Sequence, residues 1–346
     1  YSWNLYPTGT HTIYLTAGSS NYEGVLFYAL GGWTGSIDNV SVVEDLSGDF
    51  TFSRGSAATR VNAQGLVENV QIISDELVSN GNFSQIGTEE VSNGNFSQEG
   101  SELITNGDFA TDSDWNKVNA TISGGKGNLD GDGQTSILWQ DILTNGSSYK
   151  ATFTVSDYNG LGNAKVTNNN GISIFNITSN GTFTIYFQHS IASGNILFRA
   201  LSGAVFSIDN VSVKEVGQNW SLGTGWSIGE DKAVATSGAS TKLTQSISGL
   251  SGKTCKVSFT LSDYGGNGSV RVDFGSVSTD PINTNGEHIV YGTYDNNAFE
   301  LFKNTGFSGS ITNISVKEVG QDWTLGTGWS MGDGYAFTDG TVNQSL

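Results

Sequence analysis

Residues 208–220 read IDNVSVKEVGQNW, and residues 311–323 read ITNISVKEVGQDW, which is the same stretch again. A shorter copy, IDNVSV, stands at residues 37–42, and TVSDY at 154–158 matches TLSDY at 260–264. Self-similarity at a fixed period decides the architecture of a chain, and this period is as long as a whole small domain. The sequence therefore predicts a string of related modules.

The repeat predicts how the chain is divided. We expect module A at residues 101–216 and module B at 217–319. The N-terminal part of a further module follows at 320–346, and the chain opens with the C-terminal part of another at 1–44. The two end pieces together still lack counterparts of residues 250–275, so head-to-tail completion between neighbouring chains would leave a gap. The sequence is therefore expected to be a window on a longer repetitive chain.

Residues 45–100 are expected to be a linker or spacer region. It holds two short stretches, ELVSNGNFSQ at 76–85 and EVSNGNFSQ at 90–98, which resemble the ELITNGDF opening of module A at 102–109. We interpret the two stretches as abortive module openings left by recombination between repeats. Module B has lost this opening at its own start, where QNWSLGTGW stands at 218–226.

Strand-like alternation marks both complete modules. YKATFTV at 149–155 and CKVSFTL at 255–261 each place every second side chain on one apolar face. Recurring Asn-Gly pairs separate such runs, as in tight hairpin turns, and no amphipathic helical stretch is present. The inward side chains that this alternation predicts are Ala151, Phe153, Val155, Val257, Phe259 and Leu261. The predicted fold is all-β, with tandem antiparallel β-sandwiches joined by short linkers.

Charge and residue content exclude several functions. The formal net charge is −18 without any basic cluster, which argues against nucleic acid as a partner. No apolar run is long enough to span a bilayer, so no membrane insertion is expected. The single cysteine, Cys255, aligns with Tyr149 on the apolar face, and His11 and His288 share a position with Phe183, which indicates packing. No catalytic residue is identified, and the chain is predicted not to be an enzyme.

Two stretches resemble known families. LITNGDF at 103–109, followed by Trp115 and closing on IDNVSV at 208–213, resembles carbohydrate-binding-module jelly rolls of the galactose-binding-like class. RGSAATRVNAQGLVE at 54–68 is similar to a segment of bacteriophage virion proteins, especially tail fibres and their appendages.

The two resemblances together imply a structural and adhesive fibre of a phage virion. Its jelly-roll modules would contact host cell-surface glycans, and it would assemble with other virion proteins, as a homo-oligomer, outside the cell. A bacterial cell-surface or secreted polysaccharide-binding protein with the same modules stays the alternative.

Asp209 is a candidate metal ligand because it stands two and four residues before Val211 and Val213, and alternate residues of a regular strand share one face. This parity predicts that its side chain points toward the core, where a carboxylate must be paired or neutralised. One interpretation is a structural calcium ion, and the other is a hydrogen bond to a neighbouring loop.

The resemblance implies a calcium site of this kind in module A. Its ligands would be Asp209 together with Asn106 and Asp108 of the opening, because hard oxygen donors suit this ion. Asp38 stands at the position of Asp209 in the first copy, whereas module B has Thr312 there. Calcium is therefore expected in module A and not in module B.

Trp139 is the strongest candidate for contact with a sugar ring. It lies on the face opposite to Leu138, and the other copies have Thr244 and Asn343 at its position. A large aromatic among polar counterparts suggests a stacking platform, although contact with a neighbouring module or chain explains it equally well. Tyr158 and Tyr264, next to the shared Asp of a loop, are weaker candidates.

The remaining tryptophans are assigned structural roles. Trp115, Trp226 and Trp329 share one position in the alignment and are interpreted as core or edge anchors. Trp220 and Trp323 sit in very short junctions between modules, where we expect them to wedge neighbouring modules into a stiff rod.

Overall fold

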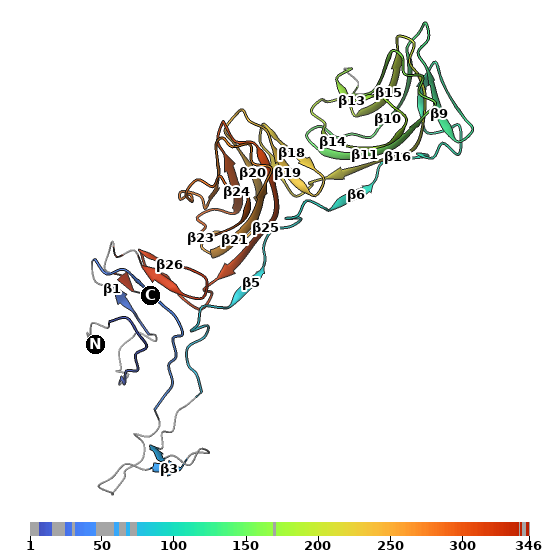
Figure 1. Cartoon of the computed structure of the whole chain (residues 1–346). Coiled ribbons are helices and arrows are strands. Elements are labelled where there is room, and N and C mark those ends of the chain that lie inside the picture. The colour runs from blue at the N-terminus through green and yellow to red at the C-terminus, as the bar shows by residue number, and fades with distance from the viewer. Residues whose placement is uncertain are drawn as a thin grey trace.

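The structure is a computed structural model that describes residues 7–15, 25–29, 32–45, 59–61, 67–69, 75–168, 171–338, 340 and 344–345. All regular elements in these ranges are strands. The described residues contain no helix that is long and apolar enough to cross a membrane. Three β units follow one another in a row, with module A at one end and both chain termini at the other (Figure 1). The prediction of tandem antiparallel β-sandwiches is confirmed.

Module A consists of two antiparallel sheets. The front sheet has the order β13-β12-β15-β10-β7, and the back sheet has the order β14-β11-β16-β9-β8. The strands are β7 (Asn116–Val118), β8 (Ala120–Ser123), β9 (Lys126–Asp130), β10 (Ser136–Asp141), β11 (Ser148–Ser156), β12 (Asn163–Thr167), β13 (Ser173–Ile177), β14 (Gly181–Gln188), β15 (Asn195–Leu201) and β16 (Val205–Val216). Alternate residues of both sheets meet in one core, as the period of two requires.

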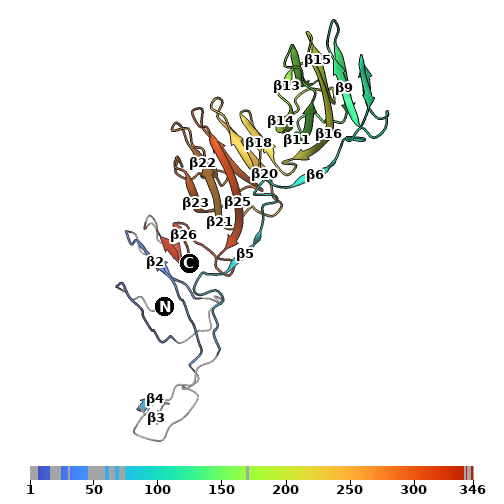
Figure 2. The ribbon, with the colours of Figure 1, turned by 45° about the vertical axis from the view of Figure 1, so that its right-hand side comes forward.

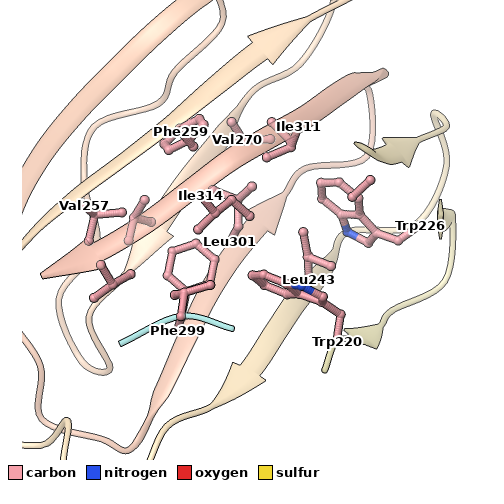
Figure 3. Packing of buried hydrophobic residues seen from close by; sticks show 14 of the residues in the cluster. Trp220, Trp226, Leu243, Val257, Phe259, Val270, Phe299, Leu301, Ile311 and Ile314 are labelled. Atoms are coloured by element: carbon pink, nitrogen blue, oxygen red, sulfur yellow. The ribbon is translucent and has the colours of Figure 1, made fainter. Parts of the chain in front are cut away.

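Module B repeats this architecture. Its front sheet has the order β17-β20-β24-β22, and its back sheet has the order β18-β19-β25-β21-β23. The strands are β17 (Ser221–Leu222), β18 (Trp226–Gly229), β19 (Lys232–Ala235), β20 (Thr241–Ser246), β21 (Thr254–Ser262), β22 (Val270–Asp273), β23 (Gly286–Thr293), β24 (Ala298–Lys303) and β25 (Gly309–Val319). Trp220, Phe259, Phe299 and Leu301 are among the side chains that fill its core (Figure 3).

The two ends of the chain pair with each other in one molecule. The end unit contains β1 (Tyr28–Ala29), β2 (Gly35–Ile37), β26 (Trp329–Met331), β27 (Ala336–Thr338) and β28 (Gln344–Ser345). β1 pairs with β28 and β2 pairs with β27, so the partial modules at 1–44 and 320–346 contribute to common sheets. β3 (Thr59–Val61) and β4 (Val67–Asn69) form a separate hairpin, and most of the segment 54–68 lies outside the described residues.

A bulge explains the repeated IDNVSV motif. Asn210 has a φ of 50°, Asn313 of 54° and Asn39 of 50°, which is the left-handed region that asparagine tolerates better than most residues. The irregular residue shifts the alternation, so that Ile208 and Val211 both face the core. The parity argument for Asp209 is therefore wrong, because its side chain is half-buried and does not join the core.

The segment at residues 76–109, called the strap, runs along one side of the row of modules (Figures 1 and 2). Its strand β5 (Ile86–Glu89) pairs with β25 of module B, and its strand β6 (Glu99–Glu102) pairs with β16 of module A. Phe83 belongs to the core of the end unit, Phe96 to that of module B and Phe109 to that of module A. Residues 76–100 of the strap, which were expected to be part of a spacer, thus contribute strands and core side chains to the sandwiches.

The strap also revises two interpretations of the tryptophans. The indole Nε1 atoms donate to backbone carbonyls of the strap: Trp115 to Asn106 at 3.0 Å, Trp220 to Asn93 at 3.0 Å and Trp323 to Asn80 at 3.1 Å. Trp220 and Trp323 are therefore the counterparts of Trp115, a role that the alignment gave to Trp226 and Trp329. Trp220 lies inside module B and does not wedge two modules apart.

Other side chains join the units along the row. Tyr186 of module A packs against the core of module B, and Tyr291 of module B packs against the core of the end unit. Lys256 of module B forms an ion pair of 3.3 Å with Asp333 of the end unit, and the Tyr291 hydroxyl donates to the same carboxylate. These contacts fix neighbouring units against each other at both joints.

Candidate functional site

The outer face of the front sheet in module A carries Trp139. The register places Trp139 of β10 between Asn116 of β7 and Leu197 of β15, with Thr167 of β12 beyond Leu197. Trp139 is partly exposed, and Leu197 is buried without belonging to the core cluster. The row therefore forms a partly apolar platform outside the core, which we call the Trp139 face.

Two basic residues lie in the next row of the Trp139 face. Arg199 of β15 stands directly between Ile137 of β10 and Lys165 of β12. Like charges opposite each other on neighbouring strands repel. Neither Arg199 nor Lys165 forms an ion pair with any residue that the structure describes, although the chain carries a net charge of −18. This pair is uncompensated within the described protein.

Buried polar atoms without partners lie beside this pair. Arg199 Nε and Thr167 Oγ1 are both enclosed, and neither makes a hydrogen bond with a residue that the structure describes. A buried donor without a partner costs free energy unless a water molecule or a ligand satisfies it. The Trp139 face thus combines an aromatic ring with two cations, which suits an anionic polar ligand.

The same face of module B is built differently. Thr244, Glu300 and Asp273 occupy the row that corresponds to Trp139, Leu197 and Thr167. Lys242 pairs with Glu300 at 2.8 Å and with Asp273 at 3.1 Å, and Arg271 pairs with Asp273 at 2.9 Å.

The charges on that face of module B therefore compensate each other. Burial acts to raise the pKa of Asp273, but hydrogen bonds from Ser278, Arg271 and Lys242 outweigh burial and lower it. The Arg271 guanidinium also lies 4.4 Å from the centre of the Phe302 ring. Since every one of these groups has a partner, the face of module B offers no counterpart to the uncompensated pair of module A.

Tyr158 and Tyr264 are anchors of their own loops. The Tyr264 hydroxyl donates to Gly268 O at 2.8 Å, and its ring stacks on Phe307. The Tyr158 hydroxyl donates to Leu161 O at 3.4 Å. Both rings pack against the cores of their modules, and the structure does not bring either of them to the Trp139 face.

The residues expected to bind calcium form hydrogen bonds with residues close to them in sequence. The Asn106 amide donates to Thr111 O at 2.7 Å, and Asp108 Oδ1 accepts from Ala110 N at 3.3 Å. The Asp209 carboxylate accepts from the backbone and side chain of Asn210.

Asp38 is exposed, and no three acidic, histidine or cysteine side chains gather as a metal site in the described ranges. Thr312, which replaces Asp209 in module B, donates to Asp231 O at 2.9 Å. These contacts do not fit a shared ion, and calcium stays a prediction that melting of the protein in EDTA and in Ca²⁺ would test.

The remaining reactive side chains are packed inside the modules. Cys255 is fully buried, and burial together with nearby Glu318 and Glu90 raises the pKa of its thiol to about 12. Such a thiol is not a nucleophile at neutral pH. The His288 ring lies 5.6 Å from Phe259, and Phe183 lies at the same distance from Phe153, as packing at one shared position predicts.

Sequence reasoning identified Trp139 but missed Arg199 and Lys165. Comparison of the modules could have indicated them. The positions of Lys165 and Arg199 in module A are occupied in module B by Arg271 and Phe302, so only module A has two basic residues opposite each other. What the sequence could not give was the absence of an acidic partner, which depends on the contacts made by every nearby carboxylate.

No family model matches the chain, and no curated protein matches it. Among solved structures, the tandem CBM22 domains of Xyn10C from Paenibacillus barcinonensis are similar, with 14% sequence identity and a TM-score of 0.28; the match covers 72% of this chain and 98% of that chain. Tandem CBM51 modules of Sp3GH98, a family 98 glycoside hydrolase from Streptococcus pneumoniae SP3-BS71, show 8% identity and a TM-score of 0.21, with 85% of this chain and 99% of that chain covered.

Proposed function

We propose that this protein is a non-enzymatic rod that binds acidic polysaccharide through the Trp139 face of module A. The observation that carries the proposal is the uncompensated pair Arg199 and Lys165, next to an outward tryptophan, in a strongly acidic chain. The indole supplies an apolar surface for a sugar ring. The guanidinium and the ammonium supply charge-assisted hydrogen bonds to carboxylate or sulfate groups.

A catalytic role has less support. Glycoside hydrolysis needs two carboxyl groups that face each other across the scissile bond. The cross-strand acids of module B, Asp273 and Glu300, instead share the ammonium of Lys242. We therefore propose binding without turnover.

The setting of this function is a bacterial cell surface or a secreted protein, where polysaccharides are accessible. A virion fibre is the second candidate, and it rests on the resemblance of residues 54–68 to phage proteins. Identification of the chain in purified virions by mass spectrometry would favour the fibre, and its recovery from the cell surface or the medium would favour the first setting.

The binding test uses the whole chain on panels of acidic and neutral polysaccharides. Trp139→Ala should abolish retention on every ligand that the wild type binds. Arg199→Gln should weaken binding to acidic ligands about tenfold or more, as expected for the loss of a hydrogen bond to a charged group. Thr244→Ala, at the corresponding position of module B, is the matched control and should change nothing.

Three other outcomes would contradict the proposal. A wild-type chain that binds no polysaccharide would leave the protein a purely structural rod. An equal loss of binding in Thr244→Ala would show that the polysaccharide site is not confined to module A. Release of soluble sugars from any ligand in the same samples would show that the protein is an enzyme.

A further inference from the structure

The strap contains three versions of one docking unit. Each version begins 13 residues after the one before it, at Glu76, Glu89 and Glu102, and each follows the pattern Glu-x-x-x-Asn-Gly-x-Phe. Residues 76–85 and 89–98 differ at one position only, where the first has Leu77 and the second has Glu90. The three units dock on three different cores.

The glutamate of each unit accepts hydrogen bonds from the segment that follows the repeated asparagine at position 39, 210 or 313. Glu102 accepts from Val213 N at 2.9 Å, Glu89 from Val316 N at 2.8 Å and Glu76 from Val42 N at 2.7 Å. The second carboxylate oxygen accepts from a serine hydroxyl in all three places, namely Ser212, Ser315 and Ser41. The same two-point contact therefore fixes each unit in register.

The Asn-Gly pair of each unit fits the bulge itself. Gly94 O accepts from Ile314 N at 2.9 Å, and Gly107 O accepts from Val211 N at 2.8 Å. A Cβ atom on Gly94 would lie 1.9 Å from Ile314 O, and the corresponding distances are 2.0 Å for Gly107 and 1.7 Å for Gly81. Only glycine can stand at this position while the unit is docked.

Aromatic and amide contacts complete the docking site of each unit, which we call its groove and which in module B consists of Ser315, Val316, Trp220 and Gln245. The Phe96 ring lies 5.0 Å from Trp220, and Gln245 of β20 exchanges two hydrogen bonds with the backbone of Ser92. In module A, Phe109 and Trp115 repeat the aromatic pair, while Gln140 makes the same two bonds to Thr105. The short piece of strap beside Phe299 and Trp220 is visible in Figure 3.

The docking contact is the same at very different separations along the chain. Glu89 and Val316 are 227 residues apart in sequence, yet their contact reproduces the contact of Glu102 with Val213 in module A. We propose that this groove is a peptide-binding site for the pattern Glu-x-x-x-Asn-Gly-x-Phe, and that an opening unit from a second copy of this chain can fill it. Copies joined in this way exchange straps, which is a form of domain swapping.

A chain with a vacated groove gives the direct test. Gly94→Val combined with Phe96→Ala disables the second unit in the whole chain. A labelled peptide of residues 86–98 should bind this variant saturably and bind the wild type at least about tenfold more weakly, because the tethered unit competes at high effective concentration. The matched control is the same peptide carrying Gly94→Val, which should not bind.

Two further measurements keep the test decisive if the vacated chain fails to fold. A chain whose residues 89–98 are replaced by the sequence of residues 102–111, ELITNGDFAT, should fold and keep module B intact in circular dichroism and limited proteolysis. Wild-type chain refolded from urea at rising concentration should form a growing fraction of dimer.

Each measurement has an outcome that overturns the proposal. A folded vacated chain that does not bind the peptide, or wild type that binds it equally well, would refute the peptide-binding site. Loss of module B in the replaced chain would refute the shared pattern. Wild type that stays monomeric at every refolding concentration would refute strap exchange between copies. None of these results depends on polysaccharide binding.

Discussion

Phe153 shows how a single side chain supports module A. It is fully buried, and the rings of Phe183, Phe198 and Phe175 lie 5.6, 5.2 and 6.0 Å from its own. Phe153→Ala should lower the free energy of unfolding of module A by about 3–5 kcal/mol, because it removes apolar area and leaves a cavity. Module B should melt unchanged in calorimetry of the whole chain, and a joint shift of both transitions would show that the modules unfold together.

Individual positions were predictable where simple alternation holds. The six inward side chains expected from the sequence are all buried, since a period of two follows directly from strand geometry. Asp209 was placed wrongly because Asn210 interrupts that period. An asparagine repeated at residues 39, 210 and 313 was a signal for a bulge, but its backbone angle could only be read from the structure.

At the scale of the element, the docking of strand β6 should depend on pH. Burial acts to raise the pKa of Glu102, but hydrogen bonds from Ser212, Val213 and Ile104 outweigh burial and lower it from its ordinary value of 4.5. A carboxylate with a lowered pKa in the folded state contributes stability above its unfolded pKa and loses it as the pH falls through the folded value.

The amide resonance of Val213 should therefore shift as the pH falls below the ordinary carboxyl pKa of 4.5, because the Glu102 carboxylate is then protonated and stops accepting its hydrogen bonds. Glu102→Gln should remove this transition. A Val213 amide that stays constant over the same range would show that the carboxylate does not hold the strand.

Strands of the two complete modules could be predicted from the sequence, but the strands of the strap could not. A spacer and a docked edge strand share the same short, polar, glycine-containing sequence, and the difference is a partner more than 100 residues away. The pattern Glu-x-x-x-Asn-Gly-x-Phe and the motif at residues 37–42, 208–213 and 311–316 each occur three times, and this equal number is the sequence feature that relates them.

The whole molecule is a row of units with different outer faces. The contacts of Tyr186 and Tyr291 fix the joints, while the strap crosses from unit to unit along one side. Alignment of the repeats predicted two complete modules with a partial module at each end, but it did not predict that the two end pieces would pair within one chain. The strap carries the chain from the end unit to module A, and modules A and B then return it to the end unit, where β1 pairs with β28 and β2 pairs with β27.

This arrangement gives each chain one Trp139 face, because the corresponding face of module B compensates its own charges. A single shallow sugar site binds in the millimolar range, which is about −4 kcal/mol. Dense display of many chains should raise the apparent affinity by roughly 10²–10⁴, since later contacts become intramolecular.

We therefore expect weak binding of acidic polysaccharide by monomeric chain in calorimetry and strong retention by beads coated with the chain. Added salt should weaken both, because it screens Arg199 and Lys165. A monomer that binds as tightly as the coated bead would mean that the chain holds further sites, and the Trp139→Ala bead would then still adhere.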